Sequence, residues 1–108
     1  MIMRQMLFNC NDGVGQDKVN EIVASLDQLL KSPNVKSAQI VPLAQSAVPE
    51  RLKAKATYLN SLLVGFDNLE AAIAFNDDPI HTEWGNVHFK PYRQDNSLFF
   101  VYDTKSSV

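Results

Sequence analysis

The 108-residue chain has the length of one domain, and its 45 % apolar and 20 % charged residues exclude a disordered chain. A formal charge of −2 without a basic stripe argues against a nucleic-acid partner, and no apolar run approaches the ~20 residues of a membrane helix. The single Cys10 excludes an intrachain disulfide, and no Cys/His spacing fits a structural zinc site. We therefore expect one domain over residues 1–108 in a reducing cytoplasm, with no membrane contact, no metal and no organic cofactor.

The first half of the chain predicts a strand, a helix and a second strand. Residues 2–10 form the first predicted strand. Apolar residues then recur at helical spacing between Asp17 and Lys31, which predicts an amphipathic helix that ends at residues 32–34. This stripe comprises Val19, Ile22, Val23, Leu26, Leu29 and Leu30. Residues 35–43 predict a second strand, and we expect it at the sheet edge because Pro42 cannot donate a ladder hydrogen bond.

The second half begins with a polar stretch. Residues 44–56 are typical of a surface loop with a short helical turn. Residues 57–66 then predict a third strand, and residues 97–102 predict the last one.

Capping residues mark two helices between these strands. Asp67 and Glu70 have the spacing of a capping box, which predicts Asp67 as the N-cap of a helix. Asp78 followed by Pro79 predicts a second, short helix, with Asp78 as N-cap and Pro79 as the first helical residue. We expect this helix to stop at Gly85-Asn86.

The predicted order β-α-β-β-α-β, with the second crossover helix broken in two, is that of a ferredoxin-like α+β domain. Its four-stranded antiparallel sheet carries helices on one face. Three strands are apolar on both faces, so the face without helices must meet another surface, and a second copy of the chain is the simplest partner. In the first of these strands Met6 and Phe8 lie on one face and Leu7 lies on the other. In the next, Leu62 and Val64 lie opposite Leu63, and in the last, Phe99 and Val101 lie opposite Leu98 and Phe100.

Segments along nearly the whole chain resemble one known family. They are Met-Ile-Met-Arg-Gln-Met-Leu-Phe at the start, Leu-Leu-Val-Gly-Phe66, Asp78-Pro79-Ile80-His81, Lys90-Pro91-Tyr92 and Leu-Phe-Phe-Val-Tyr102. With them the chain resembles the stress-responsive dimeric A/B barrel (Dabb) domain, whose His-Pro-X-His-like segment is matched at Pro79 and His81, while Asp78 replaces its first His. The resemblance implies a ferredoxin-like protomer whose sheet pairs with that of a second copy in a dimeric barrel. Most family members have no assigned reaction.

His81 is the candidate catalytic residue. A plant branch of the family is a polyketide cyclase with two active-site histidines. The resemblance places His81 at the second of these histidines, whereas Arg4 occupies the first-strand position of the first one. The predicted position of His81 in the first turn of a short helix also disfavours the charged imidazolium and leaves a neutral imidazole that can act as a base. The alternative is a histidine that only hydrogen-bonds nearby backbone. We expect no activity on the plant branch's substrate, because Arg4 replaces the partner histidine.

Four further residues are candidates for ligand binding. Trp84, Tyr58 and Tyr102 could line an apolar pocket, and the tyrosine hydroxyls could orient a ligand. Arg4 or Tyr58 could polarise a carbonyl oxygen. Trp84 has the alternative role of anchoring its helix to the sheet.

The sequence favours a small dimeric barrel protein that binds an apolar or aromatic small molecule inside the barrel. One alternative is a cofactor-independent enzyme, an aldol-type cyclase or isomerase in which His81 takes a proton next to a carbonyl. Another is a non-catalytic stress-response module whose interior is filled. The residues expected to fill it are Met6, Phe8, Phe66 and Phe100. An open pocket containing His81 would favour a ligand or catalysis over a packed, structural interior.

Overall fold

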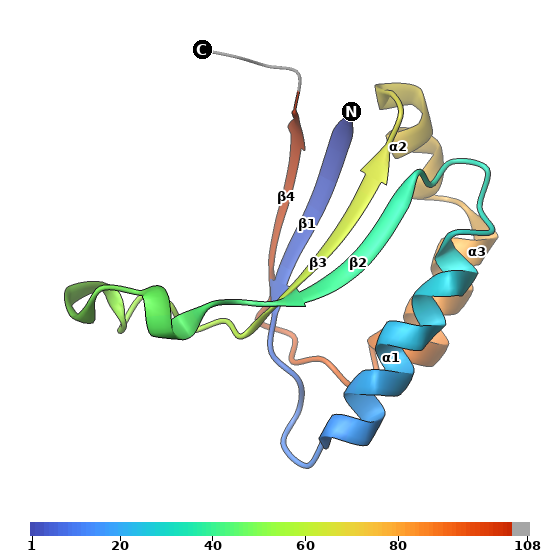
Figure 1. The fold of residues 1–108 in the computed structure, drawn as a ribbon. Helices are drawn as coiled ribbons and strands as arrows, with labels where there is room; N and C mark the ends of the chain where they lie inside the picture. The colour runs from blue at the N-terminus through green and yellow to red at the C-terminus, as the bar shows by residue number, and fades with distance from the viewer. Residues whose placement is uncertain (105–108) are drawn as a thin grey trace.

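The computed structural model describes residues 1–104 and contains the predicted order of strands and helices (Figure 1). The second crossover helix is divided into α2 and α3, as predicted, and a π-helical turn, η3, continues α3. Two 3-10 turns, η1 (Gln45–Ala47) and η2 (Glu50–Leu52), lie between β2 and β3. The other elements are β1 (Ile2–Phe8), α1 (Gln16–Leu29), β2 (Ser37–Pro42), β3 (Asn60–Phe66), α2 (Leu69–Phe75), α3 (Pro79–Trp84), η3 (Gly85–Phe89) and β4 (Leu98–Asp103).

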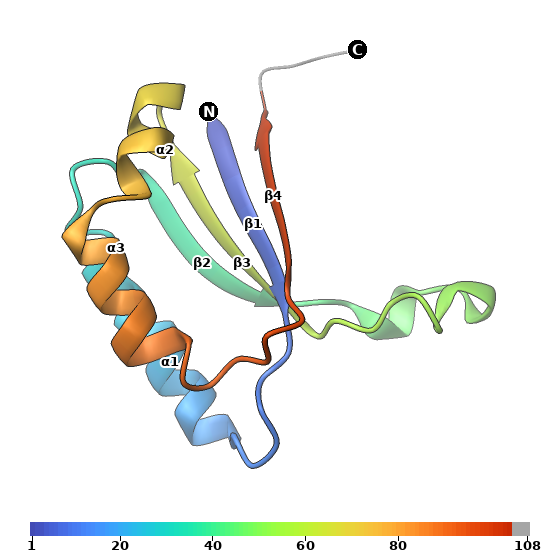
Figure 2. The same cartoon turned by 180° about the vertical axis from the view of Figure 1, so that it is seen from behind.

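The four strands form one antiparallel sheet in the order β2-β3-β1-β4. Strand β2 lies at the edge, as predicted, and Pro42 is its last residue. Helices α1 and α3 lie side by side on one face of the sheet, and α2 contacts β1 and β3 (Figures 1 and 2). The core fills the space between this face and the helices, and its buried residues are Phe8, Ile22, Leu26, Leu29, Leu62, Val64, Phe66, Phe75, Trp84 and Phe89. The α+β class and the single helical layer are therefore confirmed.

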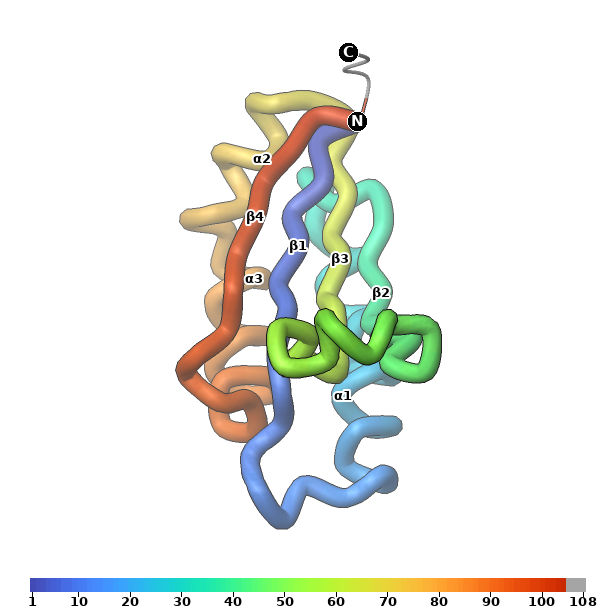
Figure 3. The backbone as a smooth tube through the Cα atoms, turned by 90° about the vertical axis from the view of Figure 1, so that its left-hand side faces the viewer, coloured from blue at the N-terminus to red at the C-terminus, as the bar shows by residue number. Residues whose placement is uncertain are grey.

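No helix among residues 1–104 covers the other face of the sheet, which we call the open face. Figure 3 looks onto it, with the helices behind the strands. Residues 43–59, which we call the arm, project past the sheet on this side and cross only one end of the strands (Figures 1 and 3). The register places Leu7 with Leu98, Gln5 with Phe100 and Met3 with Tyr102 on the open face. The open face therefore presents large apolar side chains, as the sequence pattern predicts.

The start of α2 differs by one residue from the predicted capping box. Asn68, not Asp67, is the N-cap: its backbone is extended, and its Oδ1 accepts a hydrogen bond from the Ala71 amide at 2.9 Å. An N-cap side chain must reach the amide two or three positions inside the helix, and Asn68 fulfils this condition for a helix that begins at Leu69. Glu70 then lies in the first turn, where a negative charge favours the helix dipole.

Helix α3 ends at Trp84 with Gly85 as its C-cap residue, which confirms the predicted stop at Gly85-Asn86. Asp78 is the N-cap and accepts from the Ile80 amide at 2.9 Å, as expected. Gly85 does not break the helical path, however, which continues as the π-helical turn η3. Gly85 has φ −60° and ψ −45°, which is ordinary right-handed helical backbone, and the turn closes with a 2.7 Å bond from the Lys90 amide to the Gly85 carbonyl. A glycine typically ends a helix by adopting positive φ. Among the glycines of residues 1–104 only Gly13, in the turn between β1 and α1, has positive φ, at 86°.

Candidate functional site

A cavity of about 210 Å³ lies between the helix-covered face of the sheet and the segment α3–η3. One wall consists of β1 and β3 residues, and the opposite wall consists of residues from the helices and from the segment that follows η3. The lining residues are Arg4, Met6, Leu29, Leu62, Val64, Phe75, His81, Trp84, Gly85, Phe89, Lys90 and Arg93. The space between the sheet and the helices is thus partly open. Of the residues expected to fill the barrel interior, Phe8 and Phe66 are buried in the core, Met6 lines the cavity, and Phe100 lies on the open face.

The His81 ring is fixed by its neighbour Phe75. Its Nδ1 atom lies 2.9 Å from the Phe75 carbonyl oxygen, and the two rings stack with centroids 4.0 Å apart and planes 15° apart. A carbonyl oxygen can only accept, so Nδ1 carries the proton and donates it. In the neutral ring the lone pair is then on Nε2, which is the nitrogen left for a ligand in the cavity.

Burial lowers the pKa of the His81 imidazole below its usual value. The hydrogen bond to the Phe75 carbonyl opposes this shift of the pKa, the positive charges of Arg4 and Lys90 add to it, and the Asp78 carboxylate opposes it. The ring is therefore neutral at neutral pH and can accept a proton at Nε2.

Arg4, on β1, brings a positive charge to the wall opposite His81. Its guanidinium lies 4.6 Å from the centroid of the Phe99 ring and 5.4 Å from that of Phe75, and Nη1 donates to Asn76 Oδ1 at 2.9 Å. No ion pair joins Arg4 to a carboxylate within the part of the chain that the structure describes. Burial lowers the pKa of Arg4, but an arginine still keeps its charge at neutral pH. Phe75 therefore contacts both Arg4 and His81.

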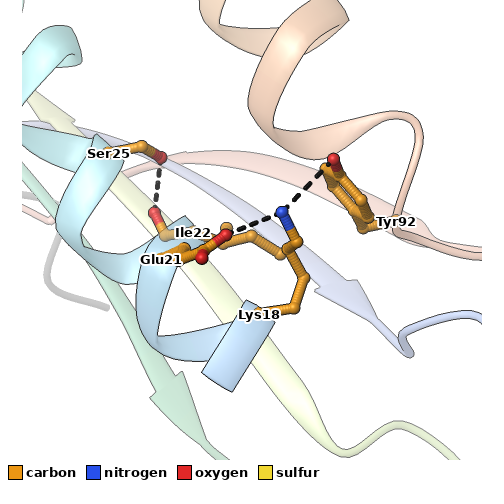
Figure 4. Close-up of polar contacts among 5 residues, drawn as sticks. All are labelled: Lys18, Glu21, Ile22, Ser25 and Tyr92. Carbon is orange, nitrogen blue, oxygen red and sulfur yellow. Dashed lines mark hydrogen bonds and ion pairs between the residues drawn. The ribbon is translucent and has the colours of Figure 1, made fainter. Parts of the chain in front are cut away.

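Trp84 lines the cavity and also anchors α3. Its ring is 2 % exposed and stacks on Phe89 with centroids 5.1 Å apart. Its Nε1 donates to Ser25 Oγ on α1 at 2.8 Å. Ser25 Oγ in turn donates to the Ile22 carbonyl at 2.5 Å (Figure 4). The anchoring role considered for Trp84 therefore exists, although it joins α3 to α1 as well as to the core.

A sequence model of a known family covers almost the whole chain. The model described as Stress Responsive A/B Barrel Domain, abbreviated Dabb, matches residues 2–105. The chain belongs to the Dabb family. The resemblance in the strand and helix motifs is thereby confirmed. No curated protein shows significant sequence similarity to this Dabb chain.

Solved structures with the same fold extend over the whole Dabb chain. A protein from Arabidopsis thaliana is 20 % identical with a TM-score of 0.82, and the match covers 100 % of this chain and 99 % of the other. A dimeric ferredoxin-like protein of unknown function from Thermobifida fusca is 18 % identical with a TM-score of 0.70, covering 94 % and 88 %. A hydroxynitrile lyase from Passiflora edulis is 14 % identical with a TM-score of 0.67, covering 94 % and 91 %. These identities establish the ferredoxin-like fold alone.

Two of the predicted ligand-binding residues of this Dabb chain lie outside the cavity. Tyr58 belongs to the arm, where its hydroxyl donates to the Asn96 carbonyl, and it lines a hollow beneath the arm on the open face. Tyr102 also points to the open face, because it lies in register with Met3. The structure thus brings Arg4, His81 and Trp84 together and leaves both tyrosines on the other side of the sheet.

Tyr92, the remaining tyrosine of the chain, packs against α1. Lys18 Nζ lies 3.5 Å from the Tyr92 hydroxyl and 4.6 Å from its ring centroid (Figure 4). Lys18 also pairs with Glu21 at 2.7 Å. Tyr92 therefore joins the segment after η3 to the first turn of α1 and does not line the cavity.

Lys90 and Arg93 line the Dabb cavity but were not among the predicted site residues. The Arg93 guanidinium lies 5.5 Å from the centroid of the Phe89 ring, and Nη1 makes long bonds to the Gln94 carbonyl (3.3 Å) and Ser97 Oγ (3.4 Å). The sequence did contain a signal for these two cations: they are three residues apart, and no Asp or Glu occurs from residue 84 to residue 94.

Metal-ligand clusters and membrane-spanning helices are absent from residues 1–104. Among residues 1–104 no group of three or more His, Cys, Asp or Glu side chains is placed to hold a metal ion. No helix in the same range has the length and apolar character to span a bilayer. Burial raises the pKa of the Cys10 thiol, which disfavours the reactive thiolate.

Proposed function

We propose that this Dabb protein binds a compact apolar or aromatic small molecule between the sheet and α3–η3. The observation that supports the proposal is the cavity of about 210 Å³, whose wall is apolar except for a few groups such as His81 and Arg4. Small-molecule sites usually combine an apolar lining with a few placed polar groups. An engineered protein cavity of about 150 Å³ binds benzene, so this cavity is large enough for one substituted ring.

The single tryptophan provides the test of binding. Trp84 lines the cavity, so its indole N–H signal in a 15N-labelled NMR spectrum should shift saturably on titration with benzyl alcohol. Gly85→Leu should abolish the shift, because Gly85 lines the cavity and a Cβ there would approach only Lys90 Cε, at 3.9 Å. Gly15→Leu, at an exposed glycine with open space around it, is the matched control and should keep the shift. An equal response in both variants contradicts binding in this cavity.

The His81 geometry supports a second candidate function, proton transfer next to a carbonyl group. The bond from Nδ1 to the Phe75 carbonyl fixes the tautomer, and Nε2 is free to take a proton from a bound carbonyl compound. The positive charge of Arg4 on the opposite wall of the cavity would stabilise the enolate that forms. The hydroxynitrile lyase from Passiflora edulis has this fold, which supports an enzymatic role for this Dabb chain.

Deuterium exchange of the α-protons of phenylacetone, followed by NMR, tests this second function. We expect the protein to accelerate the exchange and His81→Ala to slow it by about 100-fold or more. The rate should fall only as the pH drops below about 6.5, the usual histidine value, because the lowered pKa keeps His81 neutral above it. His88→Ala changes the other histidine, which contacts Gln28 outside the cavity, and should leave the rate unchanged. Equal rates for His81→Ala and the unchanged protein reject His81 as the base.

We also propose that two copies pair through their open faces in a dimeric barrel. The open face carries apolar residues of β1 and β4. The arm of one copy extends beyond its own sheet (Figure 1). The ferredoxin-like protein from Thermobifida fusca is described as dimeric, which supports the same assembly here. The cavity lies on the other face of the sheet, so each copy would hold its own ligand. A cytoplasmic location stays a prediction from the single cysteine.

A further inference from the structure

The charge of the cavity wall is unusually one-sided. Arg4, Lys90 and Arg93 all line the cavity, and none of its lining residues is Asp or Glu. The Asp78 carboxylate opposes the lowering of the His81 pKa, but Asp78 does not line the cavity. It accepts hydrogen bonds from Ser32 Oγ, Asn34 Nδ2 and the Ile80 amide. The wall therefore combines three positive side chains with an apolar lining and lacks a counterion of its own.

Two lysines elsewhere in the described chain pair with carboxylates. Lys18 pairs with Glu21 at 2.7 Å and Lys53 pairs with Glu50 at 3.0 Å, both three residues apart on one helical turn (Figure 4 for Lys18). No such pair within 4 Å involves the three cavity cations in residues 1–104. Like charges around one small cavity repel each other, and an anion between them removes this repulsion.

Arg93 provides a second, independent observation. Its Nε atom is buried and has no hydrogen-bond partner among the described residues. A buried N–H group without a partner is unfavourable, by about 1–3 kcal/mol or more when the group is charged. The Phe89 ring under this guanidinium lines the same cavity, so a ligand carboxylate placed there could accept from Arg93.

We propose, building on the proposed binding function, that the natural ligand is a monocyclic carboxylic acid bound as its anion. Its ring lies against the apolar wall of Met6, Phe75 and Phe89, and its carboxylate accepts hydrogen bonds from Arg93, with Arg4 and Lys90 adding positive potential. The cavity volume of about 210 Å³ limits the ligand to one ring with small substituents. Arginine suits this task because its planar fork of N–H groups matches a carboxylate.

Calorimetric titration with benzoate and benzamide tests the charge preference. The two probes have nearly the same shape, and only benzoate is charged. We expect benzoate to bind about ten-fold more tightly or better, which corresponds to one charge-assisted hydrogen bond. Arg93→Gln should reduce this preference most, and Arg4→Gln should reduce it to a smaller extent. Lys53→Gln removes an equal charge from the arm, outside the cavity, and should leave the preference unchanged.

The outcomes separate the inference from the proposed function. Benzamide binding at least as tightly as benzoate overturns the anion preference and leaves small-molecule binding intact. An unchanged preference in both Arg93→Gln and Arg4→Gln also overturns the assignment. If neither probe binds the unchanged protein, both proposals fail. Benzamide affinity in each variant also serves as the control for folding, since a misfolded variant would lose both ligands together.

Discussion

Replacing Trp84 with alanine is expected to lower the free energy of unfolding by about 3–5 kcal/mol, the usual cost of removing a large buried aromatic side chain. Trp84 is 2 % exposed, stacks on Phe89 and donates its Nε1–H to Ser25 Oγ on α1. It borders a cavity that already exists, so the space left by alanine would join the cavity and not be refilled by neighbours. Denaturant unfolding followed by circular dichroism measures the change.

Two variants divide this effect between packing and the hydrogen bond. Ser25→Ala removes the acceptor of the Trp84 Nε1–H bond together with the Ser25 bond to the Ile22 carbonyl, and it keeps the Trp84 ring in place. It leaves a buried indole N–H without a partner, which should cost about 1–3 kcal/mol. Trp84→Phe keeps most of the packing, so its loss in the free energy of unfolding should lie between the losses for Ser25→Ala and Trp84→Ala. A loss below 1 kcal/mol for Trp84→Ala would contradict the anchoring role, because it would mean that α3 does not depend on this contact.

The fold could be predicted from the sequence because the relevant signals are local and periodic. The helical stripe of Ile22, Leu26 and Leu29 is buried as expected, whereas Val23 and Leu30 are more than 40 % exposed at the edges of the same stripe. The first and third strands are shorter than predicted. Beyond the end of their backbone pairing, the side chain of Asn9 bonds the backbone of the third segment. It donates to the Thr57 carbonyl at 2.9 Å and accepts from the Leu59 amide at 2.8 Å. A side chain that replaces backbone pairing in this way leaves no periodic signal.

The candidate site could be predicted only in part, because pocket membership depends on which face of the sheet a residue occupies. Arg4 and Tyr102 lie on neighbouring strands, but the register pairs Arg4 with Val101, so Tyr102 is on the opposite face. Strand register is a long-range property, and a shift of one residue reverses every side chain. Arg93 was missed for a similar reason, since it reaches the cavity from an irregular segment through a single β-bridge to Cys10.

A Phe100→Asp exchange is expected to convert the dimer into monomers at micromolar concentration. Phe100 lies in register with Gln5 on the open face and is 47 % exposed in the single chain. If two copies pair through this face, a twofold axis brings two introduced carboxylates into the same apolar interface, where an unpaired charge is strongly unfavourable. Light scattering should give twice the 12.1 kDa monomer mass for the unchanged protein and a mass near 12.1 kDa for the variant.

Phe99→Asp is the matched control for this exchange. Phe99 is the neighbouring residue of β4, is 48 % exposed, and lies in register with Met6 on the helix-covered face. The control introduces the same charge into the same edge strand, so any general weakening of β4 affects both variants equally. We expect it to stay dimeric, and its new carboxylate would lie close to Arg4, whose guanidinium now contacts the Phe99 ring. Dissociation of both variants would indicate that loss of β4 structure, and not the open face, controls assembly, and a monomeric unchanged protein would reject the dimer altogether.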